Sequence, residues 1–432
     1  MLLTSLAFGA ESASVPAPDL QAIIEQNRRL QAQVASQQKM IEELTAQMTE
    51  MRQTSARQDR DLQVLKNQAE TVAPVRSPTA GLSGAKVRLS GSVGLAFFRT
   101  GSAGSFPNSE FRVDDAKILL EAQVWKEVYA VSELNLLTRE ANDEAVHIGE
   151  LYLDFENVSS LWNASGLLNV RLGRFDIPFG EEYQRRGVLT NPLISHSLSD
   201  IWGVDEGVEL YGGRGKFGYV FAVQNGGHSM LHDYNSDKAV VVRTGFEPVR
   251  WLHVSASAMR TGDLAAKADS LSEVWFASGF FRALGSATTT KTFHAELYEV
   301  DAKARWATGH VAGAVGGVHF GDDDSSRSNA RHLNYQFIEA LQDISQQFYG
   351  VVRYSEIRAP KGYPLVGWGT FGTFFLSPLL TEKLERWSFG FGYRLGPPLV
   401  VKFEYTRERG RLTTGTRRED EDFIGTEVGL KF

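Results

Sequence analysis

The chain has 432 residues, 42% of them hydrophobic, and a formal net charge of −7. That composition excludes an intrinsically disordered chain, and the acidic balance argues against a nucleic-acid binder with a dominant basic face. Cysteine is absent, which excludes a disulfide framework and a thiolate-ligated metal site. No apolar run reaches the ~18 residues of a transmembrane helix.

Three segments are predicted before the main domain. Residues 1–18 are either the tail of a secretory signal peptide or an ordinary irregular start. Residues 19–72 lack glycine and proline and follow a seven-residue repeat that begins with Leu20 and has polar interruptions such as Asn27. The repeat predicts an α-helical coiled coil, since its apolar stripe is too narrow for a lone helix packed on a domain. Residues 73–84 contain two prolines and two glycines and are predicted to form a linker.

Residues 85–432 change to a period of two residues. Between Trp387 and Tyr393, for example, aromatic side chains alternate with Ser388 and glycines. Such alternation predicts strands with one apolar and one polar face, as in a barrel or in a soluble sandwich. Aromatic residues near strand ends, and glycines beside charges on the polar face, favour a barrel with lipid outside and water inside.

Sixteen strands are predicted, an even number that is typical of bacterial single-chain barrels. They are residues 85–97, 111–124, 127–137, 146–156, 167–178, 206–213, 216–225, 238–247, 250–260, 292–306, 309–320, 346–358, 365–376, 386–395, 398–408 and 422–432. Residues 273–283 and 321–345 are assigned to loops, and short turns are expected at one end of the barrel with long loops at the other. The predicted fold class is all-β, a 16-stranded antiparallel transmembrane β-barrel preceded by a coiled coil.

Two stretches of the barrel resemble the phosphate-selective (O/P-type) outer-membrane porin family. In Val170–Arg186, VRLGRFDIPFGEEYQRR, the family's motif is matched by Gly173, Phe175, Pro178, Phe179 and Gly180. The segment ERWSFGFGYRLGPPLVVKFEYTRERG is similar to the family's final hairpin. The resemblance implies a homotrimeric barrel that passes small anions, and some family members carry an N-terminal periplasmic coiled coil.

The long connection at 180–205 follows this motif. Its mixture of charged and apolar residues is suited to a loop that folds into the barrel, although an outward-hanging loop is the alternative. Strand parity and this loop supply the basic residues that would set selectivity, unless each is simply part of a solvated wall. These pore-lining candidates are Arg171, Arg185, Arg186, Arg243, Lys303, Arg305, Arg353, Arg394 and Lys402.

The sequence favours a porin in the bacterial outer membrane, with its coiled coil in the periplasm. We expect passive diffusion of small hydrophilic, anionic solutes through a homotrimer surrounded by outer-membrane lipid, with the coiled coil in contact with peptidoglycan. An enzyme is not expected, since the GxGxxG spacing of residues 367–372 lies in aromatic strand sequence, and neither a cofactor nor nucleic acid is expected. The alternatives are a structural or adhesin-type envelope barrel and a barrel that sheathes an electron-transfer partner.

Overall fold

The chain divides into two units, Met1–Ser83 and Gly84–Phe432. The computed structural model describes residues 87–137, 146–201, 203–226, 237–265, 289–326, 328–375, 379–396 and 398–432. The signal-peptide tail, coiled coil and linker expected at residues 1–84 lie outside the described residues, as does the loop expected at 273–283. Within the described part, no helix is long and apolar enough to cross a membrane.

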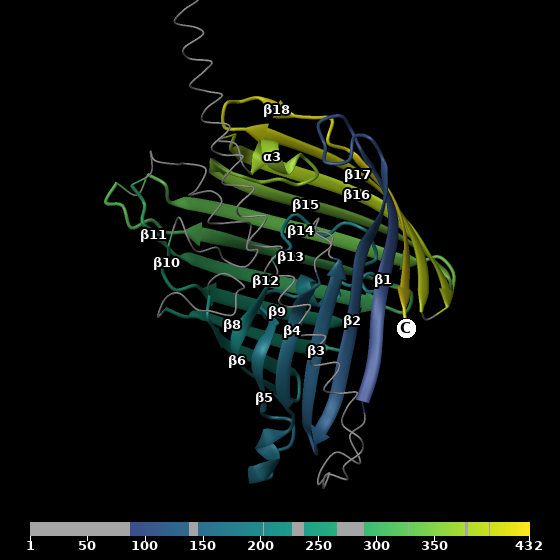
Figure 1. Ribbon diagram of the computed structural model, residues 1–432, viewed down its shortest axis with the longest axis vertical. Coiled ribbons are helices and arrows are strands. Elements are labelled where there is room, and N and C mark those ends of the chain that lie inside the picture. Colours follow the sequence, from purple (N-terminus) through teal and green to yellow (C-terminus); the bar gives the residue numbers. More distant parts are fainter. Residues whose placement is uncertain are drawn as a thin grey trace, which may run out of the picture. The chain divides into compact units, whose positions relative to one another are not determined.

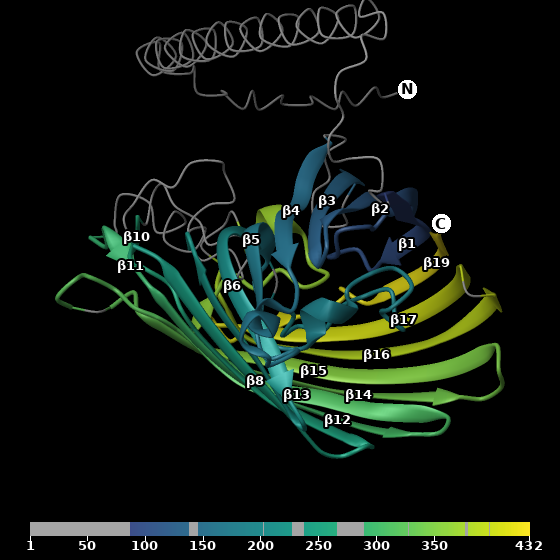
Figure 2. The same cartoon turned by 90° about the horizontal axis from the view of Figure 1, so that it is seen from below.

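In the described residues, sixteen antiparallel strands close into a barrel. Figures 1 and 2 show this barrel from two directions. They are β1 (Val87–Thr100), β2 (Glu110–Trp125), β3 (Val128–Leu137), β4 (His147–Phe155), β5 (Asn169–Asp176), β6 (Val204–Arg214), β7 (Phe217–Gln224), β8 (Ala239–Val249), β9 (Leu252–Arg260), β12 (Ala295–Trp306), β13 (Gly309–Phe320), β14 (Arg331–Asp343), β15 (Phe348–Tyr363), β16 (Thr381–Gly396), β17 (Leu399–Leu412) and β19 (Phe423–Lys431). The last strand pairs with the first, with Leu430 opposite Val93, and this pairing closes the barrel.

Short elements decorate the barrel. The two-residue strand β18 (Arg417–Arg418) pairs with β17, and β10 (Leu264–Ala265) pairs with β11 (Thr292–Phe293) in a small separate ribbon. The 3-10 helices η1 (Val158–Trp162) and η2 (Glu182–Arg185) and the single-turn helix α3 (Phe371–Phe374) lie in connections between strands.

The predicted alternation of inner and outer faces is confirmed. Along β12, Leu297, Glu299 and Asp301 face inward and are buried, whereas Tyr298 and Val300 face outward and are about half exposed. Hydrocarbon offers no hydrogen-bond partner to a polar side chain, so the outward side chains are apolar. The charged side chains lie on the inner face instead.

Two of the strand predictions are wrong, and their errors cancel in the count. Residues 331–343, which were assigned to the loop 321–345, form β14, while the strand predicted at 365–376 is a connection that includes α3. In the first half of β14, apolar side chains such as Leu333 and Tyr335 point inward and polar side chains point outward. This is the reverse of the pattern of a lipid-facing strand. In this connection Trp368 and Phe374 are buried, and Trp368 stacks on Phe423 with ring centroids 3.9 Å apart, whereas Phe371 is exposed.

The predicted asymmetry of the connections is confirmed. The pairs β2–β3, β6–β7, β8–β9, β12–β13 and β14–β15 are each joined by no more than four residues, all at one end of the barrel. The connections at the opposite end are longer, and the one from β5 to β6 covers residues 177–203. One exception at the tight-turn end is the β4–β5 connection, which contains η1.

The largest hydrophobic core lies inside the barrel, not outside it. It joins Phe175, Ile177, Phe179, Leu198 and Ile201 to the inner faces of the strands from β7 to β16. The core therefore forms where the β5–β6 connection packs against the inner wall, and this packing positions the candidate site.

Candidate pore and its constricting loop

The β5–β6 connection enters the barrel at the Pro-Phe-Gly sequence that ends β5. Pro178 has no amide donor, so it ends the strand pairing, and Gly180 takes a φ of +69°, in the left-handed region that favours glycine. A side chain at Gly180 would also collide with the carboxylate of Glu299. The N–H of Gly180 donates to Ser257 Oγ at 3.1 Å and its carbonyl accepts from Arg243 Nη1 at 2.8 Å. The loop is thereby fixed against β8, β9 and β12.

The middle of the loop is held by two charged side chains of β17. Glu404, which is fully buried, accepts the backbone N–H groups of Ile194 and Ser195, each at 2.7 Å, and the hydroxyl of Ser195. Lys402 donates from Nζ to the carbonyl oxygens of Val188 and Leu193 at 2.8 and 3.1 Å. These side chains satisfy backbone groups that the irregular loop could not pair by itself.

Strands β14 to β16 complete the attachment. Arg353 donates from Nη1 to Ser195 O at 2.8 Å and from Nη2 to Asn191 Oδ1 at 3.1 Å, and its Nε and Nη2 both bind Glu339. Tyr349 donates to the carbonyl of Pro192 at 2.9 Å. The loop therefore crosses the lumen from β5 to the wall formed by β14–β17. This confirms the prediction of an inward-folding loop and makes the outward-hanging alternative wrong.

Four of the predicted basic residues hold the loop in position, and a fifth, Arg185, also lies within the loop but lines a cavity of the lumen. Arg353 and Lys402 are 4% and 2% exposed and lie beneath the loop. Arg243 binds Gly180 and lies over the ring of Tyr183, 5.3 Å from its centroid. Arg186 pairs with Asp200 inside the loop itself.

Arg171 belongs to a separate cluster on the neighbouring strands β4, β5 and β6. Its guanidinium pairs with Asp154 and Glu209, each at 3.1 Å. It also lies over the rings of Tyr152 and Tyr211, 4.4 and 5.2 Å from their centroids. Two carboxylates thus more than compensate its single charge within the cluster.

The other four candidates meet in one cavity at the tight-turn end of the lumen. This cavity has a volume of about 850 Å³, and its wall includes Arg185, Lys303, Arg305 and Arg394 together with His310. We call these five residues the basic vestibule. Arg394 pairs with Asp343 at 2.8 Å and Arg185 with Glu339 at 3.4 Å.

Lys303 and Arg305 differ from the other members of the basic vestibule. No ion pair to either of them is found among the residues that the structure describes. Both come from β12, two residues apart, so strand geometry points them into the same space. The basic vestibule thus keeps uncompensated positive charge on the surface of the lumen.

Sequence reasoning missed Glu339, the carboxylate that joins the basic residues under the loop to the basic vestibule. Glu339 is buried between Arg353 and Arg185, and His310 lies 3.3 Å from its Oε1. It lies on β14, and its inward position could be found only once that segment was recognised as a strand. Among the described residues, no group of three or more histidine, aspartate or glutamate side chains could hold a metal ion.

No protein-family profile and no curated protein matches the sequence. Among solved structures, the chain is similar to OmpT in its trimer form, an outer membrane protein of Vibrio cholerae, with a TM-score of 0.54 and 10% identity over 81% of this chain and 99% of that one. The anion-selective porin from Comamonas acidovorans gives a TM-score of 0.51 and 10% identity, over 80% and 99% of the two chains.

The outer membrane channel DcaP of Acinetobacter baumannii gives a TM-score of 0.50 and 13% identity, over 82% and 99% of the two chains. At such identities the similarity concerns the fold. The chain therefore has the barrel fold of outer-membrane porins and channels, and its own residues must carry any argument about what it passes.

Proposed function

We propose that this chain is an outer-membrane porin, a passive diffusion channel for small hydrophilic anions. The observation that carries the proposal is the basic vestibule, where Lys303 and Arg305 line a cavity of about 850 Å³ and neither has an ion pair to any carboxylate among the described residues. Positive charge on the wall of a water-filled passage raises the local concentration of anions and lowers that of cations.

The pinned loop supports a channel more than a sheath for another protein. It crosses the lumen and is tied to β14–β17 by Glu404, Lys402 and Arg353, so the passage beside it suits small solutes. An electron-carrier partner inside the barrel would need the space that the loop occupies.

The assembly and location follow from the same proposal. Short turns at one end and long connections at the other support an orientation with the basic vestibule on the periplasmic side and the long connections outside. We propose a homotrimer in the outer membrane, with a periplasmic coiled coil at residues 19–72 that reaches the peptidoglycan. The phosphate-selective family type is part of this proposal and rests on the motif at Gly173–Gly180.

Planar-bilayer recording tests the function directly. The purified protein should form steady open channels, and a salt gradient should give a reversal potential with the sign of anion preference. Absence of conductance would leave the structural-barrel alternative, and a reversal potential of cation preference would reject the basic vestibule as the selective element.

A further inference from the structure

The outer faces of β15, β16 and β17 change from apolar to basic along their length. The strand registers define four successive outward rows, each about 7 Å beyond the last. These rows are Val352, Phe389 and Tyr405; then Tyr354, Trp387 and Arg407; then Glu356, Glu385 and Arg409; and finally Arg358, Lys383 and Arg411. The row that contains Trp387 has the aromatic character of the boundary between hydrocarbon and headgroups.

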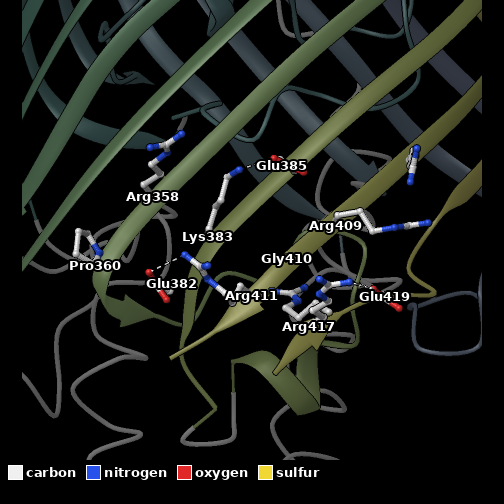
Figure 3. Close-up of a pocket in the computed structure, with 12 residues that line it drawn as sticks. Arg358, Pro360, Glu382, Lys383, Glu385, Arg409, Gly410, Arg411, Arg417 and Glu419 are labelled. Carbon is white, nitrogen blue, oxygen red and sulfur yellow. Dashed lines mark hydrogen bonds and ion pairs between the residues drawn. The ribbon is translucent and has the colours of Figure 1, made fainter. Parts of the chain in front are cut away.

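The rows beyond this boundary form a basic depression with a volume of about 720 Å³ (Figure 3). Its basic side chains are Arg358, Lys383, Arg407, Arg409, Arg411, Arg417 and the buried Arg418. We call the first six the outer basic patch. Five of the six have a carboxylate partner: Arg358 and Lys383 pair with the buried Glu356, Arg409 with Asp422, Arg411 with Glu382 and Arg417 with Glu419. The exposed pairs, such as Arg411–Glu382 at 3.0 Å, contribute little, so their arginines can exchange the carboxylate for a phosphate.

Arg407 is the member closest to the aromatic boundary. No ion pair to Arg407 is found in the part of the chain that the structure describes, and it lies opposite Trp387. It shares its face of β17 with Phe403 and Tyr405, so it points away from the lumen. A solute in the pore therefore does not meet the outer basic patch.

An apolar groove with a volume of about 620 Å³ lies on the same strands, on the side of the aromatic row that faces the tight-turn end of the barrel. Its outward lining includes Val352, Phe389, Phe391 and Phe403. Gly350 leaves the groove open, since a Cβ there would meet only the end of Ile344 at 3.7 Å. Tyr405 forms the end of the groove next to the basic rows.

We propose that this face of β15–β17 binds a phosphorylated glycolipid of the outer leaflet, with its phosphate on the outer basic patch and an acyl chain in the groove. The inference rests on the proposed outer-membrane location, because the patch lies at the end with the long connections. Arginine predominates in the patch, and its planar fork binds phosphate with two parallel hydrogen bonds. Burial of an acyl chain removes apolar surface of the groove from contact with less ordered lipid and fixes the headgroup at one depth.

The test measures lipid binding to the detergent-solubilised full chain by native mass spectrometry. The probes are bis-phosphorylated lipid A and the same lipid with both phosphates removed. The variant Arg407→Gln/Arg411→Gln should bind lipid A roughly ten- to thirtyfold more weakly, since each cation near an anionic lipid surface strengthens binding by about fivefold. Its affinity for the dephosphorylated lipid should not change.

A matched control is Arg99→Gln/Arg260→Gln, which removes two outward cations from other strands. Like the test pair, it contains one arginine without an ion pair among the described residues and one paired with a glutamate, Arg260 with Glu296 at 3.8 Å. It should bind lipid A as the wild type does. Gly350→Leu, which fills the groove and leaves the charges, should weaken both lipids alike.

Equal binding of lipid A by the two double variants would overturn the proposal, as would displacement of the lipid by inorganic phosphate alone. A change of oligomeric state in Arg407→Gln/Arg411→Gln, with lipid binding intact, would assign the face to a second copy of the chain and also overturn it. Single-channel conductance distinguishes failure of the lipid proposal from failure of the porin proposal. Substitutions in the outward patch should leave the conductance unchanged, because a solute in the pore does not meet the patch. If the double variant does not fold, Arg407→Gln alone takes its place. Arg407 has no ion pair among the described residues, so this single change does not deprive a carboxylate of its partner.

Discussion

Two sets of basic residues on the inner wall differ in what surrounds them. Arg353 and Lys402 lie under the β5–β6 connection and are occupied by its carbonyl oxygens and by Glu339 and Glu427. Lys303 and Arg305 share the same inward parity but face the cavity at the tight-turn end. Strand parity alone thus identifies an inward charge, whereas the partners of that charge determine whether it holds the loop in place or remains exposed in the cavity.

Arg353→Met should have the largest effect. It leaves Glu339 buried with one cation fewer and frees the carbonyl of Ser195, so we expect a loss of about 3–5 kcal/mol in the free energy of unfolding. Thermal unfolding in detergent measures this loss, and single-channel recording should show a larger, noisier conductance as the loop detaches. An Arg353→Met variant with the stability and the conductance noise of the wild type would contradict a structural role for Arg353. Arg353→Lys, which keeps the charge, should lose less of the free energy of unfolding.

Glu404→Leu should have the next largest effect. The carboxylate accepts two backbone N–H groups and one hydroxyl of the loop, and their loss should cost about 2–3 kcal/mol. Hydrogen exchange at Ile194 and Ser195 should accelerate, while residues of the neighbouring barrel strands stay protected. Unchanged exchange at these two amides would mean that Glu404 does not hold the loop.

Lys303→Ala/Arg305→Ala should change selectivity with the smallest change in stability. Neither side chain has an ion pair among the described residues, so the free energy of unfolding should move by less than about 1 kcal/mol. Each charge should alter the anion-to-cation permeability ratio by roughly two- to fivefold, read from the reversal potential in a salt gradient. Arg171→Gln/Glu209→Gln is the informative comparison, because it removes a cation together with one of its carboxylate partners and leaves the local charge unchanged. A larger selectivity change in that variant would contradict the assignment.

Local patterns predicted the barrel but not the attachments inside it. The alternation around Trp387 and the asymmetry of connection lengths depend on neighbouring residues, and both predictions were confirmed. The strand at 331–343 was missed because its inner face packs on the loop core and is apolar. The contact of Glu404 with Ile194 joins residues 210 positions apart, and no local period encodes such a contact.

We expect the β5–β6 loop to stay inside the barrel while the channel conducts. The hydroxyl oxygens of Ser195 in the loop and Ser388 on β16 are 3.4 Å apart, and the chain has no cysteine of its own. Ser195→Cys/Ser388→Cys should therefore form a disulfide on oxidation, and the cross-linked protein should keep the conductance and reversal potential of its reduced form. Failure to cross-link, or a conductance that changes sharply when the bond closes, would contradict a loop that is pinned across the open pore.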